Sequence, residues 1–331
     1  MIIENSKTYN VTDVENLFFR PSFCGKSAEE LGIRILYNMP LPTKVPIFSH
    51  RNNILKEFSS GWQGGTSATI KQKDIEMSKL KAEASYSAES YFSTIYEMLT
   101  SSADINLGDL SGTDLEKAET ELFRKAIVES IYATTWFGDV DGELSNYTSF
   151  NGFLRNVINI KDEDPLSTIL IYDESQYVAA NKILHDVWLR ASDELRALSA
   201  DGNLAYFVSS DIYDAYQFLL DDKCLANNGT NLVNGRQGLT YHGIPVVEIP
   251  VKQYNLNRAL SFCILTDRRN FVLALNTADS PEKEIRMWYN PDEMENRQRV
   301  VFLAGATIAD NNLVSASIFD AGVDMDVEND E

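Results

Sequence analysis

Three carboxylates stand close together in the segment Gly138-Asp139-Val140-Asp141-Gly142-Glu143, which concentrates possible metal ligands in a few residues. Carboxylate oxygens are the ligands that Ca²⁺ and Mg²⁺ prefer. The glycines, however, do not stand where a helix-loop-helix calcium site needs one. The spacing therefore favours a solvated acidic turn over a divalent-cation site.

Glycines crowd a second segment, Gly61-Trp62-Gln63-Gly64-Gly65-Thr66-Ser67, as they do in loops that bind phosphate through backbone amides. Such a loop ends in Gly-Lys-Ser/Thr and leads into a helix that stabilises the bound phosphate. That ending is missing here, and no apolar helical periodicity follows. We predict a flexible tip rather than a phosphate site.

Histidine offers little more, because His50, His185 and His242 are the only three in the chain. His185 and Asp186 fall in a predicted helix, and no second ligand stands at metal-binding spacing. Ser209-Ser210-Asp211 reads as a helix cap, since no glycine elbow surrounds a nucleophile. We therefore predict a protein that is not an enzyme and has no catalytic, cofactor-binding or metal-binding residues.

Cys24, Cys224 and Cys263 are odd in number and far apart, so we expect reduced structural thiols in a cytoplasm. The N-terminus lacks the order of a secretory signal. No apolar run approaches the roughly 20 residues that span a bilayer.

A chain of 331 residues with 44% hydrophobic content can build one elaborated domain or two. Its net charge of -20 argues against sequence-independent adhesion to nucleic acid and against docking on anionic membranes. No internal repeat is evident.

The chain is organised around a long helix predicted over 113–135, within the segment Thr113–Asp139. Thr113 and Glu116 form a capping box at its start. We expect β-branched Thr134 and Thr135, followed by Gly138, to end it. An apolar stripe at three-and-four spacing should face the core; it consists of Leu115, Ala118, Leu122, Phe123, Ala126, Ile127 and Ile131.

The N-terminal part has little core of its own. Residues 1–50 are punctuated by prolines and read as an arm. Residues 51–86 read as a polar two-stranded hairpin, whose second strand alternates cleanly from Leu80 to Tyr86. A hairpin this polar is marginal alone in water. We expect a neighbouring subunit to complete it through Trp62, Gly64, Gly65 and Ile70.

Beyond the long helix, strands and helices alternate from Thr168 to Leu220, which is typical of helices packed on a sheet. Asp173 and Gln176 form a second capping box ahead of a predicted helix. The end of the chain is rich in strands. The tail over 319–331 is acidic and is expected to be disordered.

The order of these elements resembles the major capsid proteins of tailed double-stranded DNA phages, the Hong Kong 97-type fold. The likeness covers roughly residues 45–318. Three phrases support it in sequence order: Thr135-Trp-Phe-Gly-Asp139 with Phe150-Asn-Gly-Phe153, then Tyr241-His-Gly-Ile-Pro-Val-Val247, then Leu265-Thr-Asp-Arg-Arg-Asn-Phe-Val-Leu273.

The resemblance implies an α+β fold in six parts. They are an N-terminal arm (1–50), a projecting β-hairpin or E-loop (51–86), a peripheral domain (87–164) with its spine helix (113–135), an axial α/β domain (165–300), C-terminal strands returning to the peripheral domain (301–318), and the acidic tail (319–331).

The resemblance also implies a structural protein that assembles into pentamers and hexamers of an icosahedral head around double-stranded DNA. Expected partners are the chain itself, a scaffold, a portal and decoration proteins, with no cofactor and no membrane. Assembly would take place in the host bacterial cytoplasm, and a separate scaffold or earlier cleavage is implied because no long helical segment precedes the arm. Two alternatives stay open: an encapsulin-like nanocompartment shell of the same fold, and an α+β enzyme with an unrecognised site.

Overall fold

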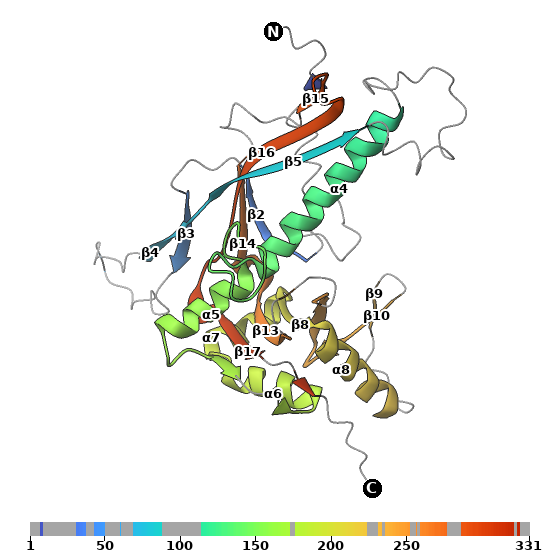
Figure 1. Cartoon of the computed structure of the whole chain (residues 1–331). Helices are drawn as coiled ribbons and strands as arrows, with labels where there is room; N and C mark the ends of the chain where they lie inside the picture. Colours follow the sequence, from blue (N-terminus) through green and yellow to red (C-terminus); the bar gives the residue numbers. More distant parts are fainter. Residues whose placement is uncertain are drawn as a thin grey trace.

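A computed structural model describes residues 7–8, 31–37, 43–49, 60, 69–87, 114–172, 176–223, 231–233, 236–251, 256, 259–276, 286–320 and 323–324. These residues form five α-helices and two six-stranded sheets (Figure 1). The helices are α4 (Asp114–Phe137), α5 (Phe153–Glu163), α6 (Ala180–Arg190), α7 (Asp193–Ala197) and α8 (Ser210–Lys223). Short 3-10 turns lie at Leu198–Asp201, Arg268–Asn270 and Asn311–Leu313.

The long helix is present as α4, with 24 residues. Phe123, Ile127 and Ile131 of the predicted stripe are buried, whereas Ala126 is exposed. The helix continues two residues past the predicted end at Thr135, and within it the Thr134 hydroxyl donates to the Ser130 carbonyl one turn earlier (2.7 Å). A threonine that bonds back to its own helix does not end it. Residue Thr113 of the predicted capping box lies outside the described residues.

One six-stranded sheet, called here the compact sheet, carries helices on its faces. Its strands run in the order β11 (Thr240–Tyr241), β12 (Ile244–Ile249), β8 (Leu204–Ser209), β13 (Ser261–Asp267), β17 (Val314–Phe319) and β6 (Ile169–Tyr172). Every residue of β8 and of β13 is buried. Such continuous apolar runs need cover on both sides.

Alternate residues of the compact sheet enter two different cores. Tyr206 and Cys263 point to the side where α6 and α8 pack, as part of one buried cluster. Phe207 and Phe262 point to the opposite side, where α5 and the end of α4 pack, as part of a second cluster. The sheet is therefore the middle layer between two groups of helices.

The second six-stranded sheet, called here the long sheet, lies alongside α4 (Figure 1). Its path is β1 (Lys7–Thr8), β15 (Arg286–Asn290), β16 (Glu295–Ile308), β14 (Phe271–Asn276) and β2 (Arg34–Tyr37). The sixth strand, β5 (Ser78–Ser87), pairs with β16 over ten residues. The predicted alternation along β5 is confirmed, since Leu80, Ala82 and Ala84 are half-buried and the residues between them are exposed.

The strand pairing predicted within residues 51–86 was wrong. The strand β4 (Thr69–Ile75) pairs with β3 (Thr43–Ser49), which precedes that range, and β5 pairs with β16 instead. The apolar face of β5 packs against the core cluster that includes α4, and this burial decides its partner. The β3–β4 pair stands off to one side of the long sheet in Figure 1.

The two strands on either side of the Asp267-Arg-Arg-Asn270 turn join different sheets, β13 the compact one and β14 the long one. The chain crosses back between β16 and β17. Asn270 ties the two crossings together, because its side chain donates to the Asp310 carbonyl (2.9 Å) and accepts from the Asp310 amide (2.7 Å). The sheets therefore do not follow the expected ranges 165–300 and 301–318, and the division into axial and peripheral domains stays a prediction.

The helix predicted after Asp173 was also misplaced. Gln176 and Tyr177 form a strand, β7, which pairs in parallel with β18 (Val323–Asp324), and α6 begins only at Ala180. The Asp320 amide donates to the Tyr172 carbonyl (2.9 Å). The start of the acidic tail is thus ordered by backbone pairing, against the prediction of disorder from residue 319. Residues 325–331 lie outside the described part.

A short pair of strands, β9 (Asn231–Val233) and β10 (Arg236–Gly238), precedes the predicted bend at Gly243. His242 and Gly243 both have positive φ, 51° and 77°, in the two-residue turn between β11 and β12. A turn with two left-handed residues matches the twist of a tight hairpin. None of the described helices combines the length and the apolar character that a membrane span requires.

Candidate functional site

The end of α4 is the point at which the helix and both sheets meet. The Trp136 ring is fully buried and lies 5.3 Å from that of Phe153 in α5, 5.5 Å from that of Phe207 in the compact sheet and 5.5 Å from that of Phe271 in the long sheet. Aromatic pairs at these separations add to the energy of burial. The indole therefore fixes α4 to both sheets.

Two glycines allow the chain to turn sharply after this ring. A Cβ on Gly138 would lie 2.2 Å from the Phe150 carbonyl oxygen, and one on Gly152 would lie 2.6 Å from the Thr134 carbonyl oxygen. The Gly152 amide donates to the Gly138 carbonyl (2.8 Å), so the two backbones touch. This contact is the physical reason for the glycines in the two sequence phrases around residues 138 and 152.

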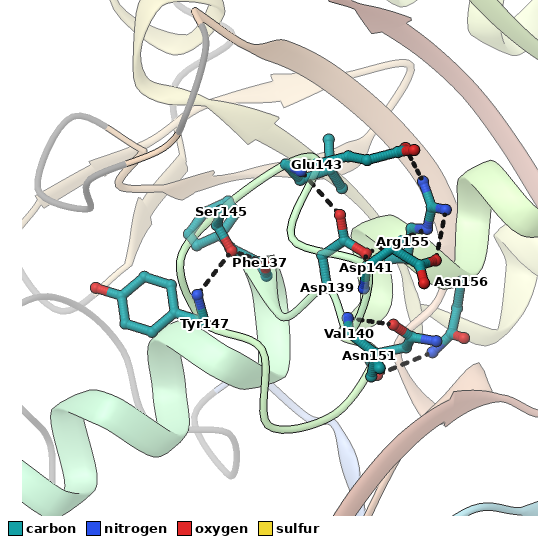
Figure 2. Close-up of polar contacts among 11 residues, drawn as sticks. Phe137, Asp139, Val140, Asp141, Glu143, Ser145, Tyr147, Asn151, Arg155 and Asn156 are labelled. Carbon is teal, nitrogen blue, oxygen red and sulfur yellow. Dashed lines mark hydrogen bonds and ion pairs between the residues drawn. The ribbon is translucent and has the colours of Figure 1, made fainter.

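The acidic segment of residues 138–143 is not simply a solvated turn. Asp139 is fully buried, and its carboxylate accepts from the amides of Leu144 (2.8 Å) and Asp141 (3.2 Å). Arg155 of α5 approaches all three carboxylates: Asp139 at 3.4 Å, Asp141 at 3.1 Å and Glu143 at 3.1 Å. Figure 2 shows Asp141 and Glu143 converging on this guanidinium.

Arg155 thus supplies the positive charge that a metal ion would otherwise bring to these carboxylates. No group of three or more His, Cys, Asp or Glu among the described residues is arranged to hold a metal. A guanidinium offers several donors in a fixed plane and satisfies more than one carboxylate. The cluster closes the loop onto α5. Sequence reasoning missed Arg155, because nothing in the spacing shows that α5 folds back over residues 139–143.

Further hydrogen bonds close the same loop, called here the joint (residues 137–156). The Ser145 hydroxyl donates to the Phe137 carbonyl (2.5 Å), and the Val140 amide donates to Asn151 (2.9 Å). Asn156 of α5 donates to the Ala306 carbonyl of β16 (3.0 Å), which ties the joint to the long sheet. These contacts hold α4 at a fixed angle to the body.

His185 and His242, which are far apart in the sequence, lie in one group of aromatic side chains in the structure. His185 Nδ1 lies 3.2 Å from the Tyr241 hydroxyl, and the His242 ring stacks on Trp188 at 5.5 Å. Burial, aided by the charge of Asp186, raises the pKa of Tyr241. The group is an aromatic contact between α6 and the β11–β12 turn. His50 lies outside the described residues.

The serines and the cysteine have structural roles. The Ser209 hydroxyl accepts from the Phe262 amide (3.2 Å), and the Ser261 hydroxyl donates to Asp211 at the start of α8. Helix α8 begins at Ser210, close to the predicted cap. Cys263 is buried, and burial raises the pKa of its thiol, which disfavours the reactive thiolate. Cys24 and Cys224 lie outside the described residues.

Most of the predicted inter-subunit residues cannot be placed. Trp62, Gly64 and Gly65, like the rest of Gly61–Ser67, lie outside the described residues. Ile70 lies in β4, opposite Phe48 of β3.

Lys73, also in β4, donates to the Asn311 side chain (2.6 Å) between β16 and β17. Burial lowers the pKa of Lys73, and the charges of Glu163 and Asp310 oppose that shift. The hairpin is therefore anchored to the body at its base.

No protein-family model matches the chain, and no curated protein matches its sequence. Solved structures do match. A chain of the satellite phage P4 procapsid, solved with its size determination protein, has a TM-score of 0.55 at 9% identity, covering 88% of this chain and 94% of that one. This chain has the fold of tailed-phage capsid proteins.

Two further structures with this capsid fold agree. A chain of Gordonia phage Cozz has a TM-score of 0.51 at 9% identity, covering 94% of this chain and 90% of that one. The capsid of an empty GTA particle has a TM-score of 0.51 at 13% identity, covering 95% and 100%. The mixed α+β class predicted from the sequence is confirmed. At these identities the likeness concerns the capsid fold alone.

Proposed function

We propose that this protein is a phage major capsid protein, a structural subunit that assembles with copies of itself into the pentamers and hexamers of an icosahedral head. The observation that carries the proposal is the extent of the fold likeness, which spans 88% of this chain and 94% of the P4 procapsid chain. A likeness over nearly the whole of both chains means that the two share a complete fold and not a fragment, which supports the same use of that fold.

The arrangement of the elements supports specific roles within that shell. Helix α4 is our candidate for the spine helix, since the joint fixes it rigidly to both sheets. The β3–β4 pair is our candidate for the E-loop, because it lies to one side of the long sheet in Figure 1. Its base is anchored through Lys73 and through Val45 and Ile75, which pack on β14. We also propose that residues 1–50 form the N-terminal arm, that residues 87–164 form the peripheral domain and that residues 165–300 form the axial domain.

The net charge of -20 suits a container for double-stranded DNA, because like charge keeps the packaged polymer from adhering to the wall. Scaffold, portal and decoration proteins are the partners we propose. The protein would assemble in the host bacterial cytoplasm and remain in the virion capsid.

Assembly of the purified protein tests the proposal. We expect closed particles by sedimentation and negative-stain microscopy, alone or with the scaffold. Trp62→Ala, or replacement of Gly61–Ser67 by Asn-Gly, should leave circular dichroism unchanged and sharply lower the particle yield. A wild type that stays monomeric even with its scaffold would contradict the proposal.

Cargo separates the two kinds of shell. Nuclease-protected double-stranded DNA inside particles recovered from the host supports a phage head. Particles filled with a cargo enzyme and free of DNA would instead support a nanocompartment shell.

A further inference from the structure

The two faces of the long sheet differ in what covers them. Strand register places Met287, Gln298 and Ala84 in one row, with Val300 and Ala82 in the next row on the same face. These residues are buried or half-buried on the side of the core that includes α4. Because successive residues of a strand point to opposite faces, the residues between them face away from the helix.

Over β15, β5 and the first half of β16, the face away from α4 is basic, whereas at β14 the same face is apolar and packs against Val45 and Ile75. In the basic rows, Trp288 lies opposite Arg297, and Arg286 lies opposite Arg299. Lys79 and Lys81 follow on β5, exposed on the same face. These six residues are called here the basic face.

Fewer carboxylates than cations lie at the basic face. Arg297 contacts Glu293 and Glu295, and Lys81 contacts Glu83 at 2.8 Å. Among the residues that the structure describes, the five cations of this face thus lie among three carboxylates, in a chain whose net charge is -20. On the other side of Arg299, Glu83 of β5 lies directly opposite it, so Arg286 at the outer strand β15 is the cation of this row nearest to an incoming carboxylate.

A complementary feature follows α5. Asp162, Glu163 and Asp164 are all exposed, and Leu166 beside them is 94% exposed, the highest value among the large hydrophobic residues described. The backbone here is held firmly: the Leu166 amide donates to the Asp164 side chain (3.0 Å), and Lys161 donates to the Pro165 carbonyl (2.6 Å). Residues 162–166 are called here the acidic turn.

We propose that the acidic turn of one subunit docks on the basic face of the next, with Leu166 against Trp288 and the carboxylates against the arginines. This contact rests on the proposed shell function and names the surfaces that join neighbours. A well-fixed apolar residue ringed by charges of the opposite sign matches the anatomy of specific interfaces. The two surfaces lie on different parts of one chain, so the contact is head-to-tail, and such a contact forms a ring when the rotation between neighbours closes.

A charge exchange tests the contact. Arg286→Glu and Asp162→Arg should each weaken association between full-length subunits by about tenfold, measured by sedimentation velocity over a concentration series. The double variant, with the charges exchanged and the net charge restored, should recover to near the wild-type affinity. Arg286→Glu places an acid opposite Arg299, so its melting temperature should not fall.

An apolar pair of variants tests the same contact without changing charge. Leu166→Ser should lower particle yield severalfold. Leu189→Ser is the matched control, because Leu189 is also exposed (55%) but belongs to α6 and to neither of the two surfaces, so its replacement should leave the yield unchanged. Leu166 is almost fully exposed, so its replacement does not threaten folding.

The outcomes separate this contact from the shell function. A wild type that never self-associates, with or without its scaffold, removes the shell function and the contact together. Wild-type particles combined with an unaffected Arg286→Glu variant, or with a double variant that fails to recover, overturn the contact alone. Binding of a double-stranded DNA duplex by the wild type that Arg286→Glu abolishes would also overturn it, since the basic face would then be a nucleic-acid site.

Discussion

The two sheets of this protein satisfy their hydrophobic faces in different ways. In the compact sheet, strands β8 and β13 are buried along their whole length, between α6 and α8 on one side and α5 with the end of α4 on the other. In the long sheet, β16 alternates between buried and half-buried residues over Glu295–Val300, and β5 between half-buried and exposed ones. The face toward α4 belongs to the main core, whereas the described apolar cover of the other face is confined to β14, where Val272 and Ala274 pack against Val45 and Ile75.

This difference teaches how a subunit can be stable and yet incomplete. A sheet with helices on both faces contains its own core. A sheet that is polar over part of one face depends on the helices packed on its other face and can offer the polar part to a partner. We therefore expect changes at α4 and at the joint to affect the long sheet most, and the variants below test that expectation.

The largest effect should come from charge placed in the stripe of α4. Ile127→Asp buries an unpaired carboxylate between the helix and the long sheet and should cost more than about 4 kcal/mol, enough to unfold or aggregate the subunit. Ala126→Asp is the matched control, since Ala126 is exposed on the next position of the same helix. A soluble Ile127→Asp variant that melts cooperatively would show that the stripe is not core.

Removing the ring that joins the two sheets should come next. Trp136→Ala leaves a large cavity among Phe153, Phe207 and Phe271 and should lower the free energy of unfolding by about 3–5 kcal/mol. Denaturant unfolding followed by circular dichroism measures this loss. A loss under about 1 kcal/mol would mean that the sheets are held together elsewhere.

The joint can also be weakened through its buried acid. Asp139→Asn removes the charge facing Arg155 and should cost about 2 kcal/mol. Glu143→Gln serves as the control, because that side chain is 62% exposed and its pairing with Arg155 should contribute at most about 0.5 kcal/mol. Equal losses from the two variants would show that burial of Asp139 is not what matters.

The smallest effect should come from the tail. Truncation after Asp324 should leave the melting temperature unchanged, because the removed residues are mostly acidic and bury little apolar surface. Truncation after Phe319 also removes β18 and the Asp320 hydrogen bond, and should cost about 1 kcal/mol. If both truncations melt alike, the β7–β18 pairing contributes nothing to stability.

The sequence predicted elements well where their periodicity was strong. The long helix, the alternating strand from Leu80 to Tyr86 and the buried strand at Leu204–Val208 are all present, because burial of an apolar stripe or face is written directly into local spacing. The prediction from sequence was wrong where polar residues were compatible with both a helix cap and a short strand. Asp173 and Gln176 match a helix cap, yet Gln176 joins a two-residue strand whose partner lies far along the chain.

The chain by itself determined the length of α4, the apolar stripe on it and the acidic character of the molecule, since each of these depends on residues near one another in sequence. Only the tertiary structure decided that β4 pairs with β3, that β13 and β14 part into different sheets, and that Arg155 gathers three carboxylates. Each of these depends on which distant surface is available to bury a face or to neutralise a charge. The spacing of residues along the chain does not show which distant surface that is. It is decided by how the elements pack in three dimensions.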